Sequence, residues 1–221
     1  MLIDLSGLAP VAHGRNRAVF QHPSDAGKLI KTILPRKMDK EPLRGWVERL
    51  RKPPYTWQFM KEIRMTYELA RRMNSDVTRL PVCDCIGLVR TTLGLGLCVE
   101  KICNAEGELA PTLRQMLNSG TFKELHLERL NQFVGAAFEF GLIANDLKPD
   151  NLVFEDRSQQ FVMVDGVGER TAIPLRLWSR RINARELSRN FAHYSAFYPG
   201  LTWDAERRAF SFATPISPPN S

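Results

Sequence analysis

The chain has 221 residues, the length of one ordinary domain or of one fold made of two lobes. Its hydrophobic fraction of 43% and its charged fraction of 25% are typical of globular proteins, and no apolar run approaches the ~20 residues of a membrane-spanning helix. The first residues lack a basic region followed by an apolar core, so we expect no secretory signal and a cytoplasmic location.

The chain is basic, with a formal net charge of +7 and a pI near 9.5. Positive charge gathers in residues 36–52 and 170–189. Such surfaces attract nucleic acid, anionic lipid or phosphate-bearing substrates, although most charge runs are ordinary solvated faces. Neither segment carries the aromatic residues or motifs typical of nucleic-acid readout. Nucleic acid is therefore not the partner we expect, and a basic binder of nucleic acid or another anionic surface stays a minor alternative.

The first elements predicted are short strands separated by polar turns. We expect strands at residues 8–12, 18–20 and 28–34 and turns at 13–17 and 22–27. A turn containing Gly14, followed by a strand that carries Lys31, could bring together a loop that covers phosphates and an ammonium group that binds them. The loop has one glycine where kinase loops usually have several, and a lone glycine in a hairpin is more often ordinary turn chemistry.

A helix is predicted next, after residues 35–55, which look like a basic insertion bounded by prolines. Thr56 is the expected N-cap, and the helix runs to about Met73. We expect one face to be buried: Phe59, Ile63, Ala70 and Met73. Glu62 lies ~60° from Phe59, on the shoulder of that face, and is the better candidate than Glu68 to pair with Lys31. An exposed Glu62 that makes pairs along the helix is the alternative.

The middle of the chain alternates strands and helices. Strands are expected at 86–89, 95–102 and 161–164, and helices at 112–118, from a capping box at Thr121 and Glu124 to Gly141, and at 178–197. The long helix should bury Leu130, Phe133, Val134, Ala137 and Phe138. Glu100 and Ile102 fall at the predicted connection between lobes, where backbone groups commonly receive an adenine; position alone supports this assignment. Four cysteines, at 83, 85, 98 and 103, form no zinc or paired CxxC pattern, so we expect reduced thiols.

The segment Asp146-Leu147-Lys148-Pro149-Asp150-Asn151, with Asp165-Gly166 after an apolar run, suits Mg-nucleotide chemistry. Phosphoryl transfer needs positioning and charge neutralisation more than covalent chemistry. Asp146 could act as the base on a hydroxyl and Lys148 could neutralise the moving phosphoryl, while Asn151 and Asp165 could supply oxygen ligands to Mg²⁺. An ordinary polar turn has the same composition, but the ordered spacing favours a kinase.

These residues, taken together, resemble the protein-kinase-like superfamily and, within it, the YrbL family of bacterial proteins of the PhoP network. The resemblance rests on Gly14-Arg15-Asn16-Arg17, His22-Pro23-x-Asp25-Ala26, Ile30-Lys31, Lys61-Glu62-Ile63-Arg64, Leu147-Lys148-Pro149-x-Asn151, Asp165-x-x-Gly168-Glu169, Ile173-Pro174-Leu175 and Trp178-Ser179. Two kinase motifs are altered. His-Arg-Asp becomes Ala144-Asn145-Asp146, and Asp-Phe-Gly becomes Asp165-Gly166-Val167.

The resemblance implies an α+β, minimal protein-kinase-like fold, with an N-terminal antiparallel sheet lobe that carries one helix and a small, mostly helical C-terminal lobe. We expect a single kinase-like domain over 1–210, with an N-lobe to about 100, a C-lobe at about 104–210, and a disordered tail at 211–221. The implied activity is ATP- and Mg²⁺-dependent transfer to a hydroxyl of an unknown acceptor; the basic segments are compatible with a phosphorylated sugar, a lipid head group or an acidic protein. The alternative is a pseudokinase that acts as a nucleotide-binding or protein-interaction module.

Overall fold

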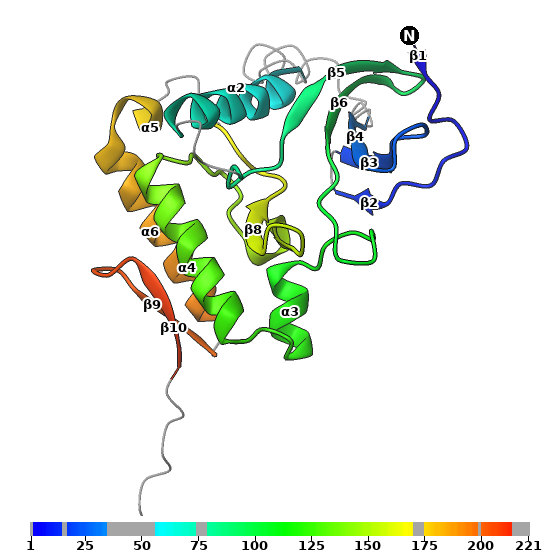
Figure 1. Ribbon diagram of the computed structural model, residues 1–221. Helices are drawn as coiled ribbons and strands as arrows, with labels where there is room; N and C mark the ends of the chain where they lie inside the picture. The colour runs from blue at the N-terminus through cyan, green and yellow to red at the C-terminus, as the bar shows by residue number, and fades with distance from the viewer. Residues whose placement is uncertain are drawn as a thin grey trace, which may run out of the picture. The chain divides into compact units, whose positions relative to one another are not determined.

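The computed structural model describes residues 2–14, 17–34, 56–73, 79–169, 175–198 and 200–213 (Figure 1). The predicted insertion at 35–55, the Ile173-Pro174 motif and the chain after 213 lie outside these ranges. The chain divides into two compact units. The first unit comprises residues 1–67 and 83–101, and the second comprises residues 68–82 and 102–221.

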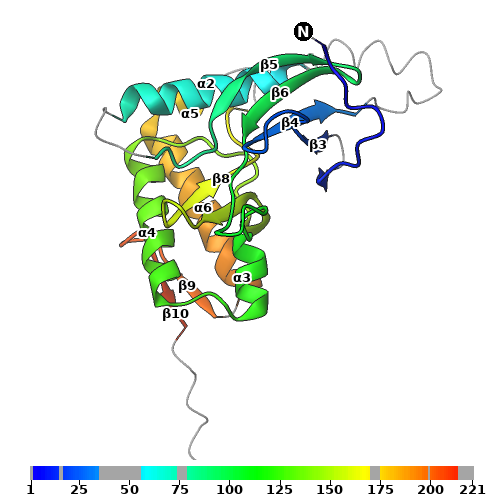
Figure 2. The ribbon, with the colours of Figure 1, turned by 45° about the vertical axis from the view of Figure 1, so that its right-hand side comes forward.

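The first unit is built on a six-stranded sheet with the order β1-β5-β6-β4-β3-β2 (Figure 2). Its strands are β1 (Leu2–Ile3), β2 (Ala12–His13), β3 (Arg17–Gln21), β4 (Lys28–Ile33), β5 (Cys85–Thr91) and β6 (Gly94–Glu100). Every neighbouring pair is antiparallel except β1 and β5, which are parallel. The sheet is therefore mixed, whereas an antiparallel sheet was expected.

The predicted strands around Lys31 are confirmed, but the strand expected at 8–12 is wrong. Only Ala12 of that run is in a strand, and it pairs with Val19. The strands of this unit are stabilised by a buried apolar cluster, which consists of Ile3, Leu5, Ala18, Phe20 and Ile30. Alternate residues of β3 point into this cluster, whereas residues 8–11 are exposed.

Helix α2 (Thr56–Arg72) confirms the predicted helix, although its buried face differs from the prediction. The buried residues are Phe59, Glu62, Met65, Leu69 and Met73. Ala70 is exposed and Ile63 is only half-buried. Residues spaced by three and four positions form the real stripe, and Glu62 lies within it rather than on its shoulder. Thr56 is the first helical residue rather than the N-cap.

The second unit is largely helical. Its elements are α3 (Leu113–Ser119), α4 (Glu124–Glu139), the 3₁₀ turn η1 (Pro149–Asn151), β7 (Leu152–Glu155), β8 (Gln160–Met163), α5 (Leu175–Trp178), α6 (Arg180–Phe197), β9 (Leu201–Asp204) and β10 (Ala209–Phe212). The hairpins β7–β8 and β9–β10 are both antiparallel, and sequence analysis missed β7, β9 and β10. Ser211 and Phe212, which were expected in the tail, belong to β10.

The helix ends of this unit follow local capping chemistry, although not everywhere as predicted. The capping box expected at Thr121 and Glu124 is wrong, because α4 begins at Glu124 with Lys123 as its N-cap. A capping box does occur at α3, where the Thr112 hydroxyl accepts from the N–H of Gln115 and the Gln115 side chain accepts from the Thr112 N–H. Gly141 follows α4 with φ of 68°, as its predicted C-terminal role requires.

The C-terminal hairpin packs on helices through aromatic side chains. Phe191 of α6 contacts Trp203 of β9 and Phe210 of β10, with ring centroids 5.2 and 5.8 Å apart. Phe138 of α4 stacks on the same Trp203 at 6.4 Å. These contacts anchor β9 and β10, which a short alternating pattern alone would not stabilise. Of the helices in the described ranges, none combines the length and the apolar character that crossing a bilayer requires.

Candidate functional site

The first unit joins Lys31 and Glu62 in a buried ion pair. Lys31 lies on β4, and its Nζ is 3.0 Å from Glu62 Oε2. The two residues are only 5% and 1% exposed. The predicted pairing is therefore present, and the alternative of a solvent-exposed Glu62 is wrong. The role of Lys31 as a phosphate ligand stays a prediction.

Arg17 is a second cation on the same carboxylate, and sequence analysis did not assign it. Arg17 Nη1 is 2.5 Å from Glu62 Oε1, and Arg17 Nε donates to Gln58 Oε1 at 3.1 Å. Each oxygen of the Glu62 carboxylate thus faces a different cation, as a buried carboxylate requires. The sheet register could have revealed Arg17: it lies two residues before Val19, the cross-strand partner of Lys31, and so shares a sheet face with Lys31.

Gly14, Glu100 and Ile102, the other predicted nucleotide-binding residues, make backbone hydrogen bonds. The N–H of Gly14 donates to the carbonyl of Arg17 at 2.9 Å, and the two residues between them lie outside the described ranges. Glu100 ends β6, and its N–H donates to the carbonyl of Asp84 at 3.0 Å. Ile102 begins the second unit, where it is buried and its carbonyl accepts a backbone hydrogen bond of 3.0 Å. Their contacts with a nucleotide stay predictions.

The second unit gathers Lys148 and Asn151 around the carboxylate of Asp146. Lys148 Nζ is 2.8 Å from Asp146 Oδ2, and Asn151 Nδ2 donates to the same oxygen at 3.1 Å. Asn151 Nδ2 also donates to the main-chain oxygen of Asp146 at 2.7 Å. Both side-chain contacts use Oδ2, so within the described residues Oδ1 of Asp146 accepts no hydrogen bond that would compete with an incoming hydroxyl. The Asp146 side chain is 53% exposed, and Asn151 is buried.

The turn after Asp165 is hydrogen-bonded to the backbone of the Asp146 loop. Asp165 follows β8, and the carbonyl of the next residue, Gly166, accepts from the N–H groups of Asn145 at 2.7 Å and Asp146 at 3.3 Å. Gly166 has φ of 81°, and a Cβ there would lie 2.8 Å from the Cβ of Asp146. Only glycine allows the two segments to approach so closely. The structure therefore brings together Asp146, Lys148, Asn151 and the turn after Asp165.

The chemistry of this group fits Mg²⁺. Because the Asn151 amide nitrogen donates to Asp146, the amide oxygen is the atom that can serve as a ligand, and Asp165 offers a carboxylate. Mg²⁺ prefers such hard oxygens in small number, with phosphates and water completing its shell. Across the described ranges no cluster of three or more His, Cys, Asp or Glu side chains could hold a metal ion.

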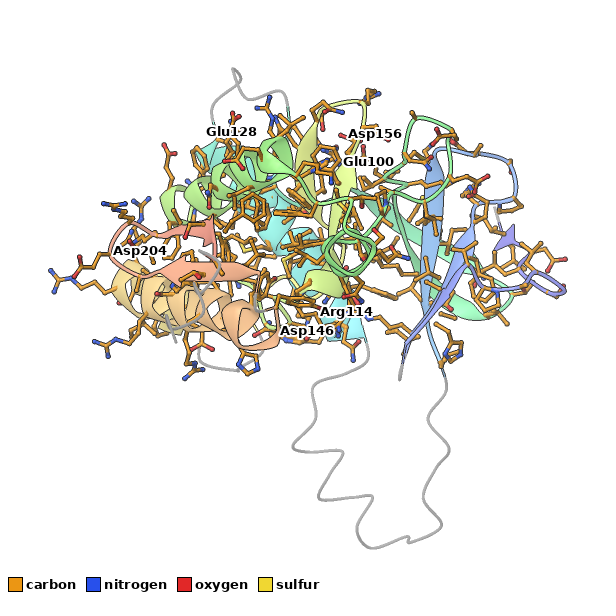
Figure 3. All side chains as sticks on the ribbon, turned by 90° about the horizontal axis from the view of Figure 1, so that it is seen from below. Glu100, Arg114, Glu128, Asp146, Asp156 and Asp204 are labelled. Atoms are coloured by element: carbon orange, nitrogen blue, oxygen red, sulfur yellow. The ribbon has the colours of Figure 1, made fainter. Side chains whose placement is uncertain are left out.

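A bidentate ion pair flanks the Asp146 loop. Arg114 of α3 binds Asp150 through Nε and Nη2, at 2.6 and 2.7 Å (Figure 3, where Arg114 and Asp146 are labelled). The Asp150 carboxylate raises the pKa of Arg114. The guanidinium also lies over the ring of Tyr198, 5.8 Å from its centroid. This pair fixes the loop between Asp146 and Asn151 from outside.

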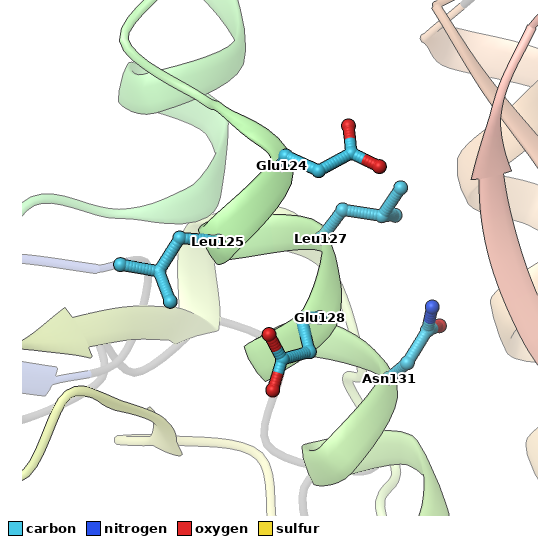
Figure 4. Close-up of a pocket in the computed structure, with 5 residues that line it drawn as sticks. All are labelled: Glu124, Leu125, Leu127, Glu128 and Asn131. Carbon is cyan, nitrogen blue, oxygen red and sulfur yellow. The ribbon is translucent and has the colours of Figure 1, made fainter.

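A pocket of about 460 Å³ at the start of α4 contains none of the predicted site residues (Figure 4). It is lined by Glu124, Leu125, Leu127, Glu128 and Asn131. None of the four cysteines forms a disulfide, and burial raises the pKa of Cys83 to about 12. A thiol with so high a pKa is neither a nucleophile nor a ready metal ligand.

The model of the family described as PhoP regulatory network protein YrbL matches residues 3–198. The chain belongs to this family. Two YrbL relatives, the uncharacterized protein YrbL of Escherichia coli K12 and that of Shigella flexneri, are each 26% identical over 204 residues, covering 88% of this chain and 87% of theirs.

The fold of this YrbL family member is kinase-like. It is similar to the crystal structure of the BubR1 kinase domain, with a TM-score of 0.50 and 14% identity, over 96% of this chain and 68% of that one. At such low identity the likeness concerns the fold alone. The expected α+β, kinase-like fold class is therefore confirmed, with a mixed rather than antiparallel sheet.

Proposed function

We propose that the chain is an ATP- and Mg²⁺-dependent phosphotransferase that acts on a hydroxyl group. The observation that carries the proposal is the Asp146 carboxylate, exposed and oriented by Lys148 and Asn151 through one oxygen only. A general base must be fixed in direction and have a free lone pair toward the proton that it takes. Asp146 Oδ1 satisfies both conditions within the described residues.

The remaining residues support the same chemistry. Asn151 and Asp165 would hold Mg²⁺, which supplies neutralisation of phosphate charge when bound. Lys148, whose ammonium lies beside the base, would stabilise the charge of the transferred group. Lys31 would bind phosphate oxygens, and its pairing with Glu62 keeps its ammonium from sampling other rotamers.

Replacement of the base tests the proposal. In an assay with Mg²⁺ and labelled ATP, we expect Asp146→Asn to lose ~10²–10⁴-fold in turnover while nucleotide affinity is retained. Asp204→Asn is the matched control, because it removes a carboxylate of the same unit that is 43% exposed, pairs with Arg207 and lies outside the Asp146 loop. Equal activity of the Asp146 variant and the wild type, or absence of any transfer by the wild type, would contradict the proposal.

A kinase-fold module that binds nucleotide without transferring phosphate is the second candidate. The sequence of residues 13–17 favours this second candidate, because it contains one glycine, Gly14, whereas phosphate-covering loops usually contain several. Both candidates predict stabilisation by ATP with Mg²⁺, of ~2.7 kcal/mol at 100 times the dissociation constant. Only a phosphotransferase also loses turnover on Asp146→Asn. The absence of any thermal shift would exclude both candidates in favour of a purely protein-binding role.

A further inference from the structure

Arg176, on the short helix α5, binds both the segment before Asp146 and the segment after Asp165. Its Nε donates to both carboxylate oxygens of Glu169, at 3.1 and 3.0 Å, and its Nη2 lies 2.5 Å from Glu169 Oε1. Its Nη1 donates to the carbonyl of Ala144 at 3.2 Å, and its Nη2 also donates to Oδ1 of Asn145. One guanidinium therefore contacts both residues that precede Asp146 and a carboxylate four residues after Asp165.

Asn145 extends this arrangement by binding the second segment itself. Its Nδ2 donates to the carbonyl of Gly168. The backbones are also joined, since the N–H of Gly168 donates to the carbonyl of Ile143 at 2.7 Å, and Ala144 bridges to Val167. We call Asn145, Glu169 and Arg176 the Asn145 network. Its effect is to fix the backbone that carries Asp146 against the backbone that follows Asp165.

The burial of the network makes it strong. The Glu169 and Arg176 side chains are only 8% and 13% exposed. In an environment that excludes water, a bidentate guanidinium–carboxylate pair has few alternative geometries and is not screened by salt. The catalytic segment is thus anchored by a permanent anion of the chain itself, the carboxylate of Glu169.

This anchoring bears on regulation. In many kinases a loop beyond the metal-binding aspartate becomes ordered only when a phosphate group added to it pairs with arginine. Here Asn145 replaces the arginine that precedes the aspartate in the kinase motif, and a carboxylate already pairs with Arg176. We propose that the Asn145 network positions Asp146 permanently, so that activity requires no phosphorylation of the chain. The inference rests on the proposed function, and it makes Arg176 and Asn145 positioning residues rather than catalytic ones.

Two variants and one control test the proposal. Arg176→Lys keeps a positive charge but loses the planar two-pronged contact, and Asn145→Ala removes both side-chain bonds of Asn145 while leaving the Glu169 pair. Arg189→Ala is the control, because Arg189 makes a 2.7 Å pair with Glu186 in the same unit and is 75% exposed. The measurements are kcat, KM for ATP, and hydrogen exchange of the Asp146 and Gly168 amides.

We expect both variants to lose roughly 10- to 100-fold in kcat, since small displacements of a catalytic group are costly, while KM for ATP is unchanged. Exchange of the two amides should accelerate, with β7–β8 amides still protected, and the control should match the wild type. Wild-type protein of unmodified mass should be fully active, and phosphatase treatment should not slow it. Unchanged exchange in both variants, or a rate that depends on phosphate, would overturn the proposal. If the wild type transfers no phosphate, the proposed function fails, and the exchange data alone decide whether the network fixes the loop.

Discussion

The close approach of Gly166 to Asp146 can be tested by a pair of matched glycine substitutions. Gly166 and Gly107 both belong to the second unit and have nearly equal φ values, 81° and 80°. A Cβ at Gly107 would have no neighbour within 4 Å. A Cβ at Gly166 would lie 2.8 Å from the Cβ of Asp146 and 3.0 Å from its carbonyl oxygen. The two alanine variants therefore share the backbone strain and differ in the steric clash.

The expected magnitudes follow from these two terms. A left-handed conformation costs an L-residue about 1–2 kcal/mol, and this cost applies to both variants. Overpacking against a neighbour that cannot move freely adds about 1–3 kcal/mol, and this cost applies only to Gly166→Ala. We thus expect destabilisation of roughly 1–2 kcal/mol for Gly107→Ala and roughly 2–5 kcal/mol for Gly166→Ala. The added methyl group can fit only if Asp146 is displaced, so Gly166→Ala should also lose ~10²-fold in turnover.

Urea unfolding at equilibrium measures the first effect, provided that both variants keep the wild-type m-value. The transfer assay with Mg²⁺ and ATP measures the second. Equal destabilisation of the two variants would show that residue 166 does not press on Asp146. Normal turnover by Gly166→Ala would show that the position of the Asp146 backbone does not matter for catalysis. Either result would refute the geometry on which the candidate site depends.

Two further predictions concern stability. Glu62→Gln leaves Arg17 and Lys31 without their carboxylate and should lower the free energy of unfolding by about 3–5 kcal/mol. Glu68→Gln, on the same helix but in a more exposed pair, should lower it by less than about 1 kcal/mol. Equal losses of the two variants in urea unfolding would contradict this. Burial lowers the pKa of His126, whose Nδ1 accepts from the N–H of Lys123 at 2.9 Å. The unfolded chain then binds the proton more readily, so stability should fall as pH drops through about 6.5 and level off below the folded pKa. His126→Gln should flatten this slope between about pH 5 and 7.5, and an unchanged slope would argue against the assignment.

The elements that depend on neighbouring residues were predicted better from the sequence than those that depend on tertiary contacts. The strand that carries Lys31, the helix from residue 56, and the grouping of Asp146, Lys148 and Asn151 all depend on neighbours within a few residues, where chain geometry leaves few choices. The capping box was placed wrongly at Thr121 because several residues near a helix start can cap it, and the final choice depends on how the helix packs. The hairpin β9–β10 was missed because its stability comes from aromatic contacts with two helices rather than from its own pattern.

By itself, the sequence indicated the fold class and the family through the resemblance that its motifs carry, and motif spacing named the candidate residues for phosphate and Mg²⁺ chemistry. The sequence also predicted the Lys31–Glu62 pair, but only the tertiary structure added Arg17 to it and joined Arg176 to Asn145 and Glu169. Arg17 and Glu62 are 45 residues apart, and Arg176 and Asn145 are 31 apart. No local rule links such positions. The cost of burying an unpaired charge selects these partners only when the chain has folded.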